Sequence, residues 1–348
     1  MVETIIGTTK DLDKAASIIR DGGLVAFPTE TVYGLGGNAL NKESSKKIYE
    51  AKGRPSDNPL IVHVSDISEV APLVKNIPDK AKKLMDAFWP GPMTLVFEKS
   101  NIVPDETTGG LDSVAIRLPA NTVARELIKK SGVPIAAPSA NQSGRPSPTT
   151  SSHVICDMNG KIDMIIDGGS STVGLESTII DVTKDRPLVL RPGFISLEDI
   201  IETIGDAGYD PAILKKPDKN YKPKAPGMKY RHYAPKAPLR IIKGSDEAVT
   251  KKILSLSEEA KLQGKKLAII CQEERRKIYE DDAVVVISIG RGNDYEEIAR
   301  NLFGVLRKCD EVGADEIVSE CFYGGGLGDA IMNRLIKAAG YNVVEAGD

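Results

Sequence analysis

Five short stretches of this chain are rich in small polar side chains, glycines or charged residues, and each lies at an apolar run. They read PTETVYGLG (28–36), KGRPSDNPL (52–60), PSANQSGRPSPTT (138–150), ESTIIDV (176–182) and RPG (191–193). Glycine lets the backbone approach a ligand closely, while Ser, Thr and Asn offer neutral donors beside the charges of Lys and Arg. This set of side chains suits a polyanion such as a nucleoside triphosphate.

Taken singly, each stretch is more simply explained as an ordinary turn. The occurrence of all five stretches at the ends of predicted strands, in one half of the chain, is harder to explain as ordinary turns. The sequence has no Walker A motif, no GxSxG or HExxH motif, and no cysteine with an obvious histidine partner. Phosphoryl and nucleotidyl transfers can proceed by positioning and charge stabilisation alone. The stretches therefore predict adenylation by direct attack of a bound substrate.

Short apolar runs bounded by turn residues predict the strands that carry these stretches. The predicted strands span residues 24–28, 59–64, 94–98, 113–119, 134–139, 164–169, 177–183 and 188–193. Helices are predicted between them, over residues 11–23, 43–53, 77–88 and 120–132. This mixture over residues 1 to about 205 predicts an α/β domain with an open, twisted sheet.

A second domain is predicted after a proline- and lysine-rich segment. Residues 211–238 have almost no aliphatic periodicity, which predicts a stiff linker. Residues 239–348 alternate apolar strands with amphipathic helices, as in a small parallel doubly wound sheet. GGGLGD (324–329) lacks the Walker lysine and the full GxGxxG spacing, so we interpret it as a turn leading into a helix. The expected domains are residues 1–208 and 239–348, joined by a linker over 209–238.

The composition is that of a globular protein without a strong charge bias. The chain has 348 residues, 41% of them hydrophobic and 27% charged, with a net charge of −3 and a pI near 5.8. The length predicts two domains. The net charge gives no support for nonspecific nucleic-acid binding, although it is compatible with a local basic cleft. Since we find neither a signal peptide nor an apolar run long enough to span a bilayer, we expect a cytoplasmic protein.

The cysteines show no metal-binding pattern. The chain has four, Cys156, Cys271, Cys309 and Cys321, with no CxxC pair and only three histidines. This spacing argues against a zinc site and against a disulfide framework. We expect reduced thiols in or near the cores.

Several long motifs resemble one known family, in the same order along the chain. The first half resembles the YrdC-like domain of threonylcarbamoyl-AMP synthases in PTETVYGLG, KGRPSDNPLIVHV, WPGPMTLVF, VAIRLPAN, PIAAPSANQSGRPSPT and STIIDVT…VLRPG. The rest resembles the long, two-domain form of those enzymes in PGMKYRHYAP and GGGLGDAIMNRLIKAA. The resemblance implies a twisted open-sheet YrdC-like N-terminal domain with a concave positive surface, followed by a small Rossmann-like domain.

The resemblance implies a nucleotidyltransferase that makes L-threonylcarbamoyl-AMP from L-threonine, bicarbonate or CO2, and ATP, releasing pyrophosphate. Magnesium would arrive with ATP, held chiefly by phosphates and water, because no carboxylate cluster identifies a protein ligand for it. The product would pass to a separate tRNA threonylcarbamoyl transferase, which modifies adenosine 37 of tRNAs reading codons that begin with A. Binding of tRNA by this chain is compatible with the activity but not required, and we expect no membrane partner.

The resemblance also assigns roles to individual residues. Lys52, Arg54, Ser139 and Asn141 match the catalytic residues of the ATP site, where cations facing a hydroxyl–amide pair can neutralise charge as pyrophosphate leaves. The further positions assigned to ATP are Asn58, Ser113, Ala137 (through its backbone), Ser147, Arg191 and Tyr230. The positions assigned to threonine are Thr31, His63, Arg117 and Ser177.

Within the threonine site, Arg117 is the expected partner of the amino acid's carboxylate, while the hydroxyls and His63 contact its polar groups. Without the resemblance, a satisfied core histidine is the simpler interpretation of His63. Strand alternation places its side chain opposite those of Val62 and Val64, so that it can face a cleft while they face the core.

We also expect the linker to form part of the active site. PGMKYRHYAP contains two tyrosines, one histidine and two cations within ten residues. Tyr230 would stack on or hydrogen-bond the nucleotide, and Lys229 and Arg231 would add charge at the phosphates. The alternative is a solvated tether.

Two other functional classes stay open. The first is an RNA-binding module with a basic concavity, which predicts salt-dependent RNA affinity and no pyrophosphate release. The second is a hydrogenase-maturation carbamoyltransferase, a class that contains a similar domain. Those enzymes carry acylphosphatase and zinc-finger segments, for which this chain has neither the length nor the CxxC pairs.

Overall fold

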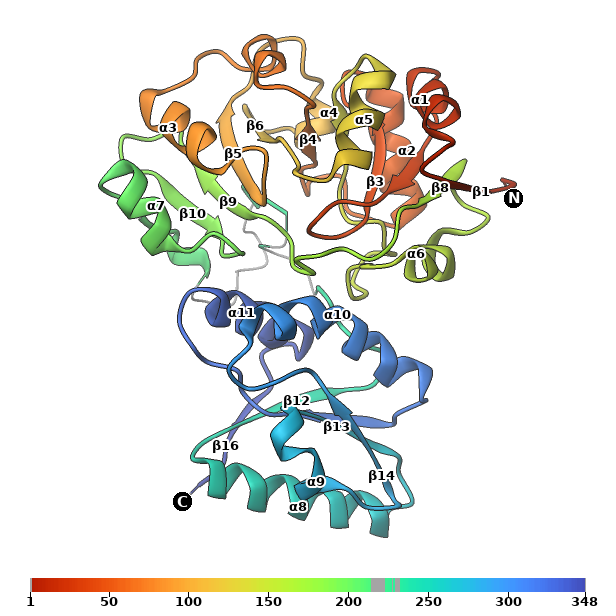
Figure 1. The fold of residues 1–348 in the computed structure, drawn as a ribbon, viewed down its shortest axis with the longest axis vertical. Helices are drawn as coiled ribbons and strands as arrows, with labels where there is room; N and C mark the ends of the chain where they lie inside the picture. Colours follow the sequence, from red (N-terminus) through yellow and green to blue (C-terminus); the bar gives the residue numbers. More distant parts are fainter. Residues whose placement is uncertain (1, 214–222, 227, 229–231, 348) are drawn as a thin grey trace. The chain divides into compact units, whose positions relative to one another are not determined.

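The computed structural model describes residues 2–213, 223–226, 228 and 232–347. Contacts divide the chain into two compact units (Figure 1). The first comprises Met1–Ser143 and Ser147–Tyr230, and the second comprises Gly144–Pro146 and Arg231–Asp348. Within the described ranges, no helix is both long and apolar enough to cross a bilayer.

The first unit is built on a mixed sheet of eleven strands in the order β1-β8-β2-β3-β7-β4-β6-β5-β9-β10-β11. In that order the strands are Ile5–Thr8, Met164–Asp167, Val25–Phe27, Gly34–Asn38, Ile135–Ala136, Ile61–His63, Ser113–Arg117, Met93–Glu98, Thr178–Asp181, Leu188–Arg191 and Gly208–Tyr209. Some neighbours are parallel, such as β4 with β6, and others are antiparallel, such as β5 with β6. The predicted α/β class is confirmed.

Helices cover the two faces of this sheet unequally. They are α1 (Leu12–Arg20), α2 (Lys42–Lys52), α3 (Asp79–Phe88), α4 (Asp105–Thr108), α5 (Thr122–Ser131), α6 (Ser151–Met158) and α7 (Leu197–Ile204), with short 3-10 turns at Ile67–Glu69, Ala71–Leu73 and Pro211–Ile213. One face buries the larger core under α2, α3, α6 and α7. The opposite face is covered by α1 and α5 around β8, β2 and β7.

The continuation of that second face, over β4, β6 and β9, is covered by the linker. Ile61 and Ala115 form a small apolar cluster there with Ala225 and Met228. Ala225 is fully buried and Met228 is 5% exposed. The described part of the linker is therefore packed against the sheet, which its lack of aliphatic periodicity did not predict.

Three strands of this sheet, β1, β3 and β11, were not predicted. β3 begins within the glycine-rich stretch PTETVYGLG, for which the sequence predicted only a ligand loop, and extends two residues beyond it. At Gly36, an added Cβ would lie 2.7 Å from the Phe27 ring and 2.8 Å from Ile135 Cγ2. Glycine is needed because large side chains of the neighbouring strands cross over β3. Apolar alternation, the pattern used to predict strands, is absent from such a segment.

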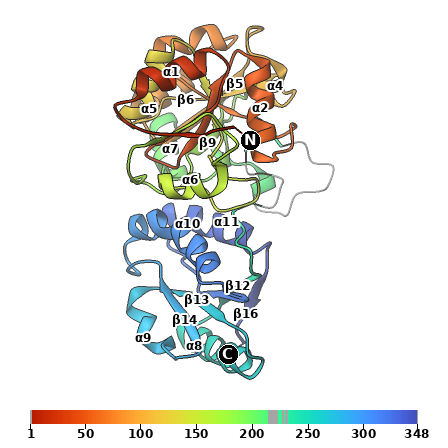
Figure 2. The ribbon, with the colours of Figure 1, turned by 90° about the vertical axis from the view of Figure 1, so that its right-hand side faces the viewer.

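The second unit contains a five-stranded, all-parallel sheet in the order β14-β13-β15-β12-β16. In that order the strands are Val284–Ser288, Leu267–Cys271, Glu316–Ser319, Leu239–Lys243 and Val343–Glu345. The helices are α8 (Asp246–Leu262), α9 (Arg276–Tyr279), α10 (Tyr295–Glu311) and α11 (Leu327–Ala338), with a 3-10 turn at Glu273–Arg275. Figure 2 shows α10 and α11 on one face and α8 and α9 on the other. The predicted doubly wound parallel sheet is confirmed.

All four cysteines are free thiols. Cys271 and Cys309 are buried and Cys321 is half-buried, as expected for thiols in or near cores. The expectation is wrong for Cys156, which is exposed on α6.

Candidate active site

Lys52 connects two of the stretches that the sequence singles out. It is the last residue of α2, which Gly53 ends in the left-handed conformation at φ 58°. The Lys52 side chain is buried, and its Nζ donates to the carbonyl oxygens of Ser139 and Asn141, each at 2.5 Å. Burial and the nearby charge of Arg54 hold the pKa of Lys52 well below its ordinary value. The lysine thus fixes the backbone that carries the predicted hydroxyl–amide pair.

The hydroxyl–amide pair is itself hydrogen-bonded. Ser139 Oγ donates to Asn141 Oδ1 at 2.5 Å, and Asn141 Nδ2 donates to Gln142 O at 2.8 Å. Ser143 N donates to Lys52 O at 2.9 Å, which adds a backbone link between the two stretches. Three of the four predicted catalytic residues are therefore brought into direct contact.

Arg54, the fourth, shapes the loop that leads into β4. Its Nε donates to Asn58 O at 3.2 Å and its Nη2 donates to Pro59 O at 3.0 Å. Asn58 is 2% exposed, and its Oδ1 has no hydrogen-bond partner among the described residues. A buried acceptor without a donor costs about 1–3 kcal/mol. This oxygen is therefore suited to receive a donor from a ligand.

Ser113 begins a strand beside that loop, and Ala137 follows another. β4 and β6 are parallel with Ile61 level with Ala115, so the first residue of β6, Ser113, lies at the edge where β4 begins. Ala137 follows β7 directly, and its backbone N–H donates to Ile61 O at 2.8 Å. That N–H is already used by the sheet, which leaves the Ala137 carbonyl as the group for a backbone contact.

Arg117 forms a buried ion pair that the sequence analysis did not include. Its Nη2 lies 2.6 Å from Glu30 Oε1, its Nη1 donates to Thr31 Oγ1 at 2.8 Å, and its Nε donates to Gly91 O at 3.3 Å. Burial alone would raise the pKa of Glu30, but the charge of Arg117 and backbone N–H donors outweigh it and hold the pKa below its ordinary value. A guanidinium has five N–H donors. Three are used by these contacts, so among the described residues two are left for a substrate carboxylate.

His63 is a neutral polar group in this environment. It is 4% exposed, its Nδ1 donates to Ile61 O at 3.1 Å, and its ring meets Phe27 edge-on. Burial and the charge of Arg117 lower the pKa of His63 to about 3. Since β4 and β6 place it level with Arg117, both side chains project from the same face of the sheet.

Replacing His63 with Gln should make stability less sensitive to acid. The folded-state pKa of about 3 lies below the ordinary 6.5, so below pH 6.5 the unfolded chain takes up a proton that the folded chain does not. Stability then falls by about 1.4 kcal/mol for each pH unit, a slope that glutamine does not contribute. Urea unfolding at pH 7, 6 and 5 measures this. Equal slopes for the variant and the parent would show that His63 titrates normally.

Ser177 is held by two neighbours from other strands. Thr94 of β5 lies 2.7 Å from it, hydroxyl to hydroxyl. Arg191 Nη2 donates to the Ser177 carbonyl at 3.0 Å and to its Oγ at 3.2 Å. The structure therefore joins a residue predicted for threonine to one predicted for ATP, which places the two expected subsites next to each other.

Ser147 donates to Glu176 Oε1 at 2.6 Å, and both are buried. Glu176, Glu30 and Thr94 are site residues that the sequence analysis missed. Both glutamates stand directly before a residue that was predicted, Ser177 and Thr31. Residue type alone does not indicate them, because a carboxylate is unfavourable beside a polyanion unless a cation or hydrogen-bond donor is placed against it.

The predicted residues gather on one part of the sheet. Most of the described ones lie in or beside β3, β7, β4, β6, β9 and β10, which are consecutive in the sheet except for β5 between β6 and β9. Lys52 and Arg54 instead lie at the end of α2, and Ser147 lies in the loop between β7 and α6. Tyr230 falls outside the described residues, as do Lys229 and Arg231. Their described neighbour Met228 is buried on the face from which His63 and Arg117 project.

Comparison with known proteins places the chain among enzymes. The threonylcarbamoyl-AMP synthase of Pyrococcus abyssi is 50% identical over 331 residues, which cover 95% of this chain and 94% of that protein. The chain belongs to the threonylcarbamoyl-AMP synthase family. The threonylcarbamoyl-AMP synthase of Bacillus subtilis is 48% identical over 332 residues, covering 95% and 93% of the two chains.

Both halves of the chain match models of this family. Residues 17–193 match the Sua5, YciO and YrdC family, described as telomere recombination, and residues 195–340 match the threonylcarbamoyl-AMP synthase C-terminal domain. The crystal structure of Pyrococcus abyssi Sua5 complexed with L-threonine is similar over 100% of both chains, with a TM-score of 0.91 at 48% identity. The predicted family and fold are confirmed, whereas the role of each site residue stays a prediction.

Proposed function

We propose that this chain makes L-threonylcarbamoyl-AMP from L-threonine, bicarbonate or CO2, and magnesium-bound ATP. The observation that carries the proposal is the contact between the two expected subsites through Arg191 and Ser177. A nucleotide and an amino acid bound there would lie side by side. Incubation of the pure protein with all three substrates, followed by mass spectrometry of the product, tests the proposal.

The proposed reaction needs no enzyme nucleophile. The amine of threonine combines with CO2 to give a carbamate, and a carbamate oxygen attacks the α-phosphorus of ATP. That P–O bond forms as the bond to the β-phosphate oxygen breaks, and pyrophosphate leaves with the electron pair. Aligning three reactants is mainly an entropic problem. The chain contributes by fixing the loops with Lys52 and by placing Arg54 to stabilise the charge that develops on the leaving group.

Magnesium enters this proposal as part of the nucleotide substrate. Among the described residues, no three His, Cys, Asp or Glu side chains gather closely enough to hold a metal ion. Magnesium commonly keeps several waters and binds through substrate phosphates. The phosphates of ATP, together with water, would therefore hold the ion.

Valine should be a poor substitute for threonine in the proposed reaction. Thr31 and Ser177 would contact the substrate's hydroxyl, and valine would leave buried polar groups unpaired at a cost of about 1–3 kcal/mol for each group. Serine lacks only a methyl group and should be accepted better than valine. The rate of pyrophosphate release with each amino acid measures this order. Equal kcat/KM values for valine and threonine would place the pocket elsewhere.

The linker completes the proposed site. The described linker residues Ala225 and Met228 pack on the face that carries His63 and Arg117. A segment there would exclude water from the carbamate and the mixed anhydride. ATP and threonine together should therefore slow proteolytic cleavage after Lys229 or Arg231. Cleavage at the same rate with and without both substrates would mean that the linker is only a tether.

A further inference from the structure

The second unit contains three residues of the stretch PSANQSGRPSPTT. These are Gly144–Pro146, which cluster by contact with residues beyond the linker. Arg307 of α10 is 3% exposed, and its Nη2 donates to Pro146 O at 2.6 Å. A charged side chain is thus buried on a helix of the second unit and directed at a backbone carbonyl 161 positions away in sequence.

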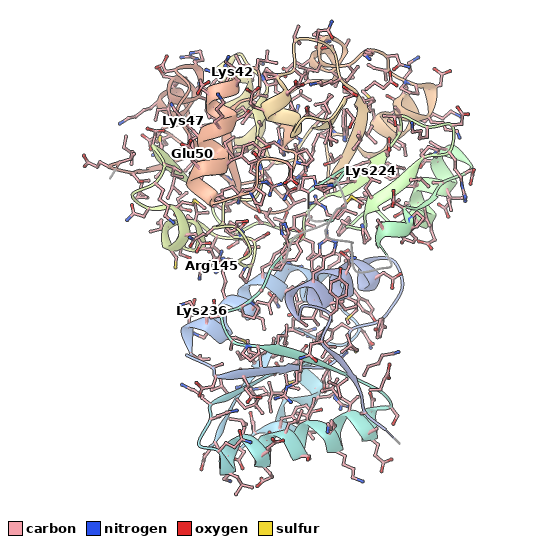
Figure 3. All side chains as sticks on the ribbon, turned by 180° about the vertical axis from the view of Figure 1, so that it is seen from behind. Lys42, Lys47, Glu50, Arg145, Lys224 and Lys236 are labelled. Carbon is pink, nitrogen blue, oxygen red and sulfur yellow. The ribbon has the colours of Figure 1, made fainter. Side chains whose placement is uncertain are left out.

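One turn further along α10, Asp310 contacts both the same loop segment and the end of the linker. Its Oδ1 accepts from Lys236 N at 2.7 Å, and its Oδ2 lies 3.7 Å from Arg145 Nη2. Figure 3 shows Arg145 and Lys236 near one another. Ala234 N donates to Gly144 O at 2.8 Å, which links the two segments directly. α10 therefore holds three consecutive loop residues through side chains and the linker backbone.

The held residues stand between positions expected to contact ATP. Ser143, just before them, is bound to Lys52, and Ser147, just after them, is bound to Glu176. The backbone from Ser139 to Ser147 is thus fixed at its centre by α10. Misplacement of a binding group by about 1 Å can cost on the order of 10²-fold in rate.

We propose that Arg307 is a positioning residue for ATP, through which the second unit sets the conformation of the ATP-binding stretch. This proposal rests on the proposed function, in that Ser139, Asn141 and Ser147 bind the nucleotide. Arg307 acts through the Pro146 carbonyl rather than by contact with the substrate. The second unit then has a part in catalysis although it contributes no reacting group.

Full-length Arg307→Gln tests the proposal by steady-state pyrophosphate release. We expect the KM for ATP to rise on the order of tenfold while the KM for threonine changes less than about twofold. Arg307→Lys keeps a donor within reach of the Pro146 carbonyl and should recover part of the loss. Lys308→Ala removes an exposed cation of the same helix, paired with Glu311, and should behave as the parent.

Asp310→Asn is the second variant, for the case in which Arg307→Gln does not fold. It removes the charge that faces Arg145 but keeps an acceptor for Lys236 N, and it should raise the KM for ATP in the same direction by a smaller factor. An unchanged KM for ATP in a folded Arg307→Gln or Asp310→Asn protein would overturn the proposal, as would equal rises for ATP and threonine. Ser139→Ala distinguishes failure of the Arg307 proposal from failure of the proposed ATP site. If Ser139→Ala also leaves the KM for ATP unchanged, the assignment of Ser139 to ATP binding is wrong.

Discussion

Replacing Arg54 with alanine should lower kcat/KM for ATP by about 10²–10³-fold, as loss of one preorganised donor to a developing anion does in other enzymes. Arg54 is buried and donates to the carbonyls of Asn58 and Pro59, so its charge is held in place before ATP binds. Alanine would remove the charge and loosen the loop. Steady-state kinetics with ATP as the varied substrate measure the loss.

The matched control is Lys42→Ala, which removes an exposed cation at the other end of the helix that leads to Arg54 (Figure 3). It should leave kcat/KM unchanged. Arg54→Lys keeps the charge but loses the two-pronged geometry, so it should fall between the parent and alanine. Normal turnover by a folded Arg54→Ala protein would remove this residue from the ATP site.

Replacing Arg117 with alanine should destabilise the first unit by about 3–5 kcal/mol, because it leaves the buried Glu30 carboxylate without its partner. The unpaired carboxylate is desolvated, so its pKa in the folded variant rises above the unfolded value. The stability deficit should then shrink as the pH falls and Glu30 becomes protonated. Urea unfolding of parent and variant at pH 7 and pH 5 measures both effects.

The double variant Glu30→Gln with Arg117→Met separates stability from function. It removes both charges at similar volume, which for buried ion pairs is often neutral or stabilising. We expect most of the lost stability to return while threonine binding, followed by calorimetry, stays weak. Full threonine affinity in the double variant would contradict a role for Arg117 in binding the substrate carboxylate.

The sequence was sufficient to predict the elements that are encoded by a local pattern of residues. Buried strands such as β5 and β9 are apolar runs between turn residues, and α2 has both a capping Asn41 and a terminating Gly53. β3 could not be predicted in that way. Its glycines pack under Phe27 and Ile135, two side chains that reach it only in the folded sheet.

The site shows the same division. Hydroxyl, amide and cationic residues beside strands identified the stretches, and the resemblance to one family supplied their roles. Neither the residue types nor the family resemblance shows that Lys52 donates hydrogen bonds to the Ser139 and Asn141 carbonyls, or that Glu30 pairs with Arg117. These contacts join positions about 90 residues apart, and sequence spacing carries no information about them.

The most direct test of the account is pyrophosphate release from ATP by the pure full-length protein, with each co-substrate omitted in turn. Direct attack by a threonine carbamate predicts release only when threonine and bicarbonate are both present, and no labelled protein after incubation with α-labelled ATP. Stoichiometric pyrophosphate release from ATP alone, with a nucleotide left on the protein, would show an enzyme-bound adenylate and contradict the proposed mechanism.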